Sequence, residues 1–171
     1  NEKNQSKFES YSLDFFNGER VISSSTIDLG INSTVSIWFN KESASSVLLG
    51  AASYSSEYLL YIETSQLYIR IASVAKAFSH SMVQGEWYHL VIVRQGDSIE
   101  VFVNNSSIGT QTGYGTGTTT QIDAIGAKKI NYGSYPFDGK ISQVSGFDYA
   151  LSSTQISSLY NSGSPINPMT L

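Results

Sequence analysis

The segment spanning residues 86–110, EWYHLVIVRQGDSIEVFVNNSSIGT, restricts the fold of this chain more than any other feature. Its first half, Trp87–Val93, is almost continuously apolar, as expected for a strand covered on both faces, and Ser98–Asn104 alternates more loosely. Gln95-Gly96-Asp97 separates the two runs as a turn. The pair Asn104-Asn105 then predicts a second tight hairpin, because asparagine tolerates the left-handed backbone. The segment therefore predicts consecutive antiparallel strands.

Further strand-like runs recur at regular spacing, each bounded by Ser, Asn, Gly or Glu. Between Gly109 and Gln121, glycine and threonine predominate, so we expect a mobile loop or an irregular sheet edge there. The pattern is typical of an all-β meander. The expected strands cover residues 11–16, 20–23, 34–39, 47–52, 58–63, 67–72, 87–93, 98–104, 107–111, 122–126 and 139–147.

One helix signal lies near the end of the chain. Ser152 followed three residues later by Gln155 is a capping-box pattern, and a glycine and a proline further on provide the stop. We therefore expect a short helix over residues 153–161. Its apolar stripe, which includes Ile156 and Leu159, favours a lid over an open end of the β-structure rather than a surface for a partner.

Length and composition narrow the class of protein. The 171 residues suit one domain, 1–171, in which we expect residues 1–7 to be flexible and residues 164–171 to form a C-terminal tail. Charged residues make up only 14% of the chain, which is common in extracellular β-proteins. The net charge of -4, without a Lys/Arg cluster, argues against nucleic acid as a partner. No apolar run approaches the roughly 20 residues that span a bilayer, so we expect no membrane insertion.

Cysteine is absent, which excludes disulfides, thiolate nucleophiles and cysteine-based metal sites. The chain also starts at Asn1 without methionine or an apolar signal region. We therefore expect a processed protein or an excised domain of a larger one.

Six short segments occur in an order and spacing typical of one family, and together they run from near residue 11 to near residue 163. They are YSLDFFNGERV (11–21), VSIWF (35–39), GEWYHLV (85–91), IEVFVNN (99–105), FDGKI (137–141) and YALS (149–152). The chain resembles the laminin G-like jelly-roll modules of the concanavalin A-like lectin/glucanase superfamily. The resemblance implies a two-sheet antiparallel jelly-roll β-sandwich with one short C-terminal helix. It also implies a non-catalytic sugar- or protein-binding module attached to a larger surface protein.

The residues argue against catalysis. Glycoside hydrolysis uses two carboxyl groups roughly 5 to 9 Å apart, and the glucanases of this superfamily carry a Glu-x-Asp-x-x-Glu strand motif that this chain lacks. Only two histidines are present, and His89 falls within an apolar strand, where a core role is expected. Trp38 and Trp87 also lie within strand patterns, so core packing is favoured over a sugar platform. We expect no enzyme activity.

Calcium is the one cofactor that the resemblance suggests, since many relatives bind a structural calcium. The acidic pair that usually follows the Phe-x-Gly turn is replaced here by Ser142-Gln143, which removes two carboxylates. Oxygen ligands remain in other turns, although ordinary turn or solvated residues are the alternative reading of each. The candidate calcium ligands are Asp14, Asn17 and Asp138, with Asp123 and Asp148 as further candidates.

Glycan recognition is the leading function, because sugar rings require an aromatic platform beside hydrogen-bonding groups. The loop 130–136, INYGSYP, supplies Asn131, Tyr132 and Tyr135, and two other polar loops supply Tyr54 and Tyr114. An ordinary structured loop is the alternative for each.

A structural or protein-interaction module, such as a phage virion decoration or an adhesin domain, is the alternative function. Protein is then the partner in place of a glycan or cell-surface polysaccharide. Either function places the protein outside the cell, at a cell surface or on a virion surface. An exposed apolar patch would favour the protein-binding alternative, and a polar groove with tyrosines would favour the lectin.

Overall fold

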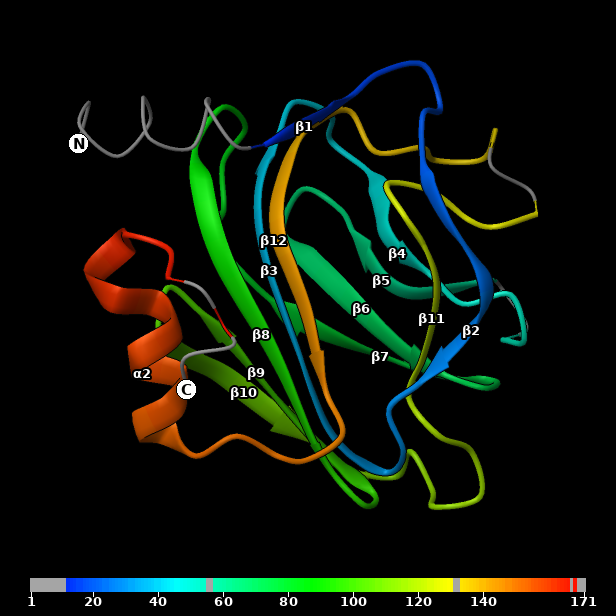
Figure 1. Ribbon diagram of the computed structural model, residues 1–171, viewed down its shortest axis with the longest axis vertical. Helices are drawn as coiled ribbons and strands as arrows, with labels where there is room; N and C mark the ends of the chain where they lie inside the picture. The colour runs from blue at the N-terminus through cyan, green and yellow to red at the C-terminus, as the bar shows by residue number, and fades with distance from the viewer. Residues whose placement is uncertain (1–11, 55–56, 131–132, 167, 169–171) are drawn as a thin grey trace.

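The chain folds into two six-stranded antiparallel sheets packed face to face (Figure 1). A computed structural model describes residues 12–54, 57–130, 133–166 and 168. The strand order is β1-β12-β3-β8-β9-β10 in the first sheet and β2-β11-β4-β5-β6-β7 in the second. The strands are β1 (Leu13–Phe15), β2 (Val21–Asp28), β3 (Asn32–Lys41), β4 (Ser46–Gly50), β5 (Tyr58–Ile62), β6 (Gln66–Ile71), β7 (Val74–Ser79), β8 (Trp87–Gln95), β9 (Ser98–Val103), β10 (Ser106–Gln111), β11 (Gln121–Ile125) and β12 (Gly139–Phe147).

The double hairpin that the sequence predicts forms half of the first sheet. Strand β8 pairs with β9 through the turn after Gln95, and β9 pairs with β10. Asn104 and Asn105 both have positive φ, 49° and 65°, as a tight hairpin turn requires. On its other side β8 pairs with β3 in continuous register from Asn32 opposite Gln95 to Asn40 opposite Trp87.

The main core lies between the sheets and follows the two-residue alternation of the strands. In β3, Val35, Ile37 and Phe39 face inward and are almost completely buried. Leu67 and Ile69 of β6 belong to the same cluster from the opposite sheet. The predicted sandwich is confirmed.

Two strands differ from the sequence-based expectation. Strand β7, VAKAFS, was not expected, because alanine and lysine weaken the strand signal. It forms through a complete ladder with β6. Strand β2 extends over eight residues rather than four, since both of its ends pair with β11 and the register shifts across the serine-rich middle between them. Pairing with a neighbouring strand therefore supplies what local propensity lacks.

The predicted helix is confirmed as α2 (Ser153–Tyr160), followed by the 3-10 turn η1 (Asn161–Gly163). Its N-terminus has the complete capping box, with Ser152 and Gln155 bonded reciprocally. The expected position over an open end of the sandwich is wrong. The helix lies on the outer face of the first sheet, beside β8 and β9 (Figure 1). Val91 and Val93 face outward there because Leu90 and Ile92 face inward, and the helix covers them.

The Gly/Thr-rich segment between β10 and β11 forms a loop, and the β8–β9 turn holds it by hydrogen bonds; its expected mobility stays a prediction. The Asp97 carboxylate accepts hydrogen bonds from the main-chain N–H groups of Gly113 (2.8 Å) and Gly115 (2.5 Å). These bonds also hold the pKa of Asp97 below its ordinary value. Tyr114 between them is buried in the main core. Across the described residues, no helix has the length and apolar character needed to cross a membrane.

Candidate functional site

Two of the five predicted sugar-binding residues are core residues, so the prediction was wrong for both. Tyr54 is only 2% exposed, and its hydroxyl donates to the Thr119 carbonyl (2.5 Å) and accepts from the Gln121 N–H (3.0 Å). Burial raises the pKa of Tyr54 to about 12. Tyr114 is also buried, and its hydroxyl lies 3.5 Å from the Ile69 carbonyl. A tyrosine in a polar loop can thus turn its ring into the core and satisfy its hydroxyl on the main chain.

Tyr135 is exposed, as the prediction requires. Its side chain is 57% accessible, and its carbonyl anchors the loop to β4 by accepting from the Val47 N–H (2.8 Å). Asn131 and Tyr132 lie outside the described residues. The ring of Tyr135 meets the ring of Tyr61 edge to face, with centroids 5.5 Å apart.

This contact extends into an aromatic cluster on the outer face of the second sheet, which we call the tyrosine face. It consists of Tyr58, Tyr61, Tyr68 and Tyr135. Tyr61 lies opposite Tyr68 in the β5–β6 ladder, with ring centroids 6.0 Å apart, and 5.5 Å from Tyr58. The three strand tyrosines are half-buried. Tyr61 and Tyr68 face outward because their strand neighbours face the core. An irregularity in the β4–β5 pairing between Leu60 and Tyr58 lets Tyr58 lie on the same face, although it is three residues from Tyr61.

Hydrogen-bonding groups border the tyrosine face. The Arg70 guanidinium lies 5.0 Å from the centre of the Tyr58 ring and donates to the Ser73 carbonyl (3.1 Å). The Tyr68 hydroxyl donates to the Gln66 side-chain oxygen (2.9 Å) and lies 3.5 Å from a Glu63 carboxylate oxygen. Such a surface combines apolar ring faces with donors and acceptors.

The phenols of Tyr61 and Tyr68 are held in their neutral form. Burial, aided by the Glu63 charge, raises the pKa of Tyr61. The same two effects raise the pKa of Tyr68. Both hydroxyls therefore keep their proton at neutral pH and can donate as well as accept. The strand tyrosines were missed in the sequence because an alternating strand pattern does not reveal which face remains open.

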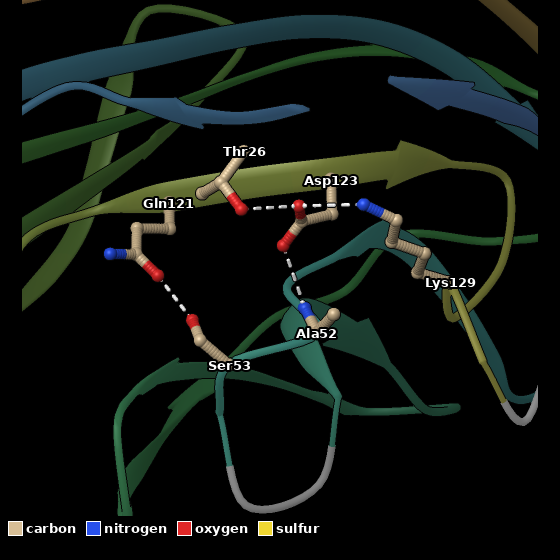
Figure 2. Close-up of polar contacts among 6 residues, drawn as sticks. All are labelled: Thr26, Ala52, Ser53, Gln121, Asp123 and Lys129. Atoms are coloured by element: carbon tan, nitrogen blue, oxygen red, sulfur yellow. Dashed lines mark hydrogen bonds and ion pairs between the residues drawn. The ribbon is translucent and has the colours of Figure 1, made fainter. Parts of the chain in front are cut away.

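Asp123, a further calcium candidate, is a structural residue that ties three segments together (Figure 2). Its buried carboxylate accepts from the Thr26 hydroxyl of β2 (2.7 Å), from the Ala52 N–H after β4 (2.8 Å) and from the Lys129 ammonium (3.3 Å). Burial acts to raise the pKa of Asp123, but these three donors together hold it below its ordinary value. Beside it, the Ser53 hydroxyl donates to the Gln121 side chain. The carboxylate is already satisfied by protein donors.

The other calcium candidates are not gathered into a metal centre. Asp14 and Asp138 line one shallow pocket of about 250 Å³, together with Glu42 and Lys140, whereas Asn17 is not among its lining residues. Asp148 is an exposed residue after β12. In the parts of the chain that are described, no three His, Asp or Glu side chains come close enough to share a metal ion.

His89 occupies a buried polar position under α2. Its Nε2 lies 2.8 Å from the Ser36 hydroxyl, and its ring stacks on Trp38 with centroids 4.7 Å apart. A serine nucleophile requires a histidine oriented by a third group. Here Nδ1 of His89 has no hydrogen-bond partner among the described residues, and the ring is 0% exposed. The pair lacks both a carboxylate and access for a substrate, and burial matches the expected core role of His89.

The fold is that of a lectin-like jelly-roll β-sandwich. The chain belongs to the concanavalin A-like lectin/glucanases superfamily, whose laminin G-type family model matches residues 16–157. A comparison with curated protein sequences gives no significant match.

Solved structures share the fold at low sequence identity. A heptameric SAP-like pentraxin from Limulus polyphemus superposes with a TM-score of 0.69 at 19% identity, covering 88% of this chain and 80% of the pentraxin. A putative carbohydrate binding protein from Bacteroides ovatus has a TM-score of 0.66 at 16% identity, covering 85% of this chain and 45% of that one. The Ruminococcus gnavus IT-sialidase CBM40 bound to α2,3 sialyllactose has a TM-score of 0.57 at 14% identity, covering 85% of this chain and 100% of that domain.

Proposed function

We propose that this protein is a non-catalytic carbohydrate-binding module of a larger surface protein and that the tyrosine face binds the glycan. The observation that carries the proposal is the contiguous cluster of three half-buried tyrosines and one exposed tyrosine beside Arg70 and Gln66. Aromatic rings cover the apolar C–H faces of sugars, and the neighbouring polar groups reach their hydroxyls. A recognition role of this kind fits an extracellular, cell-surface or virion-surface location.

The comparisons support the class of ligand. Two proteins of similar fold support a carbohydrate ligand. One is a putative carbohydrate binding protein, and the other is a CBM40 bound to α2,3 sialyllactose. The non-catalytic part of the proposal is supported by the buried Ser36–His89 pair, which has no access to substrate.

The test is binding to a broad glycan array, followed by affinity measurement for the best sugar with single alanine variants. Tyr135→Ala and Tyr68→Ala should each weaken binding at least about tenfold, which corresponds to about 1.4 kcal/mol. Tyr149→Ala is the matched control, because Tyr149 is 45% exposed but packs against Phe147 of the first sheet. Absence of any sugar binding, or wild-type affinity in both tyrosine-face variants, would contradict the proposal.

Calcium at Asp14, Asn17 and Asp138 stays a prediction, and the same array tests it with added calcium and with chelator. A native-state calcium site should also raise the thermal midpoint by mass action. An unchanged midpoint and unchanged sugar binding in both conditions would end that prediction.

A second candidate function is a protein-interaction module, and strand β2 is the observation that favours it. This strand lies at the edge of the second sheet and is exposed along almost its whole length. Val21, Ile22 and Ile27 are each 44–48% exposed. An open edge can accept an added strand from a partner chain. Concentration-dependent sedimentation that disappears in Ile22→Lys, together with silence on the glycan array, would favour this alternative.

A further inference from the structure

Lys41 is an unusual buried cation at one end of the sandwich. It is the last residue of β3, and the alternation that turns Ile37 and Phe39 inward turns Lys41 inward as well. The side chain is only 2% exposed. In the described part of the chain, no carboxylate forms an ion pair with its ammonium. Burial alone therefore lowers the pKa of Lys41, with no compensating charge.

The space beside Lys41 is a pocket of about 470 Å³. Thr64 and Ser65 contribute to it from the β5–β6 turn, and His80, Ser81 and Gln84 contribute from the connection between β7 and β8. These residues offer hydroxyl, amide and imidazole groups, and none of the described residues that line the pocket is acidic. Buried charges in proteins are normally paired with an opposite charge. The Lys41 ammonium has polar neighbours in this pocket but no negatively charged partner among the described residues.

His80 lines the same pocket and lies close enough to Lys41 to feel its charge. Its Nδ1 accepts from the Met82 N–H (3.1 Å), so the proton of the neutral ring lies on Nε2. That nitrogen is buried and lies near main-chain groups of Gln66 and Glu63, although no contact among the described residues meets the geometry of a hydrogen bond. Burial and then the nearby Lys41 charge lower the pKa of His80, although main-chain groups of Gln66 and Glu63 act in the opposite direction. Lys41 and His80 are thus electrostatically coupled.

The pocket is preformed, because the connection between β7 and β8 is fastened to the end of β3. The Lys41 carbonyl accepts from the Gly85 N–H (2.9 Å), and the Asn40 side-chain amide donates to the Gly85 carbonyl (2.8 Å). The His80 N–H also donates to the Ser65 carbonyl across the pocket rim (2.9 Å). Little ordering is therefore needed on binding, which favours affinity.

We propose that this pocket is an anion-binding site in which the Lys41 ammonium pairs with a carboxylate or sulfate group and hydroxyl and amide groups of the pocket wall donate to it. The anion supplies the counter-charge that the fold omits, and the low local dielectric strengthens the pair. The site is separate from the tyrosine face and does not depend on that face binding a glycan.

The test is an NMR titration of the ¹⁵N-labelled protein with acetate and with methyl sulfate, each at constant ionic strength set with sodium chloride. We expect saturable chemical-shift changes at the His80 ring and the Met82 amide. In Lys41→Met the apparent affinity for the anion should be at least tenfold lower. Lys128→Met, which removes a lysine outside the pocket, is the matched control and should titrate like the wild type. The anion that saturates at the lower concentration identifies the carboxylate or the sulfate as the preferred group.

Two results would overturn the proposal. One is the absence of saturable shifts in the wild type up to about 100 mM of either anion, and the other is an identical titration in Lys41→Met. If Lys41→Met does not fold, Lys41→Gln takes its place. If neither variant folds, the wild-type titration is the deciding measurement.

Discussion

The clearest quantitative consequence of the structure concerns His89 and the acid stability of the protein. The ring is 0% exposed, lies between β8 and the helix, and contacts Trp38 and Tyr160 at centroid distances of 4.7 and 6.0 Å. Among the described residues, the Ser36 hydroxyl is its one side-chain hydrogen-bond partner, and no carboxylate contributes to its pKa. Burial therefore lowers the pKa of His89 from 6.5 to about 4.

The sign of the effect follows from proton linkage. Between pH 6.5 and pH 4 the unfolded chain binds a proton at His89 and the folded protein does not, so stability falls as the pH falls. Each pKa unit corresponds to about 1.4 kcal/mol. The free energy of unfolding should thus be about 3 kcal/mol lower at pH 4 than at pH 7 because of this one residue.

Urea unfolding followed by tryptophan fluorescence at pH 7, 6, 5 and 4 measures this loss. His89→Gln keeps a side chain that can form a hydrogen bond with Ser36. Between pH 7 and pH 4, its free energy of unfolding should fall by about 3 kcal/mol less than that of the wild type. Both proteins share the contributions of Asp28, Asp97 and Asp123, whose lowered pKa values make them lose stabilisation mainly below pH 4. Parallel losses in the two proteins, or a His89 pKa near 6.5 by NMR, would refute the reasoning. The NMR titration needs only the wild type if the variant does not fold.

Three further substitutions test the packing. Leu159→Ala should destabilise the protein by about 2 to 5 kcal/mol in urea unfolding, because Leu159 of α2 is buried against Val91 and Val93 of β8. A loss below about 0.5 kcal/mol would contradict that burial. Gly139→Ala should lower the free energy of unfolding by at least about 2 kcal/mol. The reason is that φ is 135° and an added Cβ would lie 2.1 Å from the Asn40 carbonyl oxygen. A thermal midpoint equal to that of the wild type would disprove this. Asp123→Ala should lower the free energy of unfolding by about 1 to 3 kcal/mol, because it leaves buried donors unpaired. Asp123→Asn should lose less stability. The reverse order would argue against the network in Figure 2.

The sequence was a good guide where local rules dominate. The turn at Asn104-Asn105 and the helix cap at Ser152 were readable because each depends on residues a few positions apart. The strands were readable because alternating apolar residues must bury one face, and the two-sheet sandwich followed from the family resemblance. Strand β7 was not readable, since it owes its form to pairing with β6.

The candidate site depended on tertiary structure. Tyr54, Tyr114 and Tyr135 look alike in the sequence, each within a polar loop, yet the first two pack into the core and only the third is exposed. Tyr61 and Tyr68 read as ordinary strand residues until β5 and β6 pair and bring Tyr135 beside them.

By itself, the sequence determined the class of fold, because periodicity, turn chemistry and capping act over short distances along the chain. Only the tertiary structure decided which face of each sheet stays open, where the helix packs, and that Lys41 points into a pocket without a counter-charge. The physical reason is that exposure and electrostatic environment depend on residues far apart in sequence, such as Lys41 and His80, which meet only once the strands between them have paired.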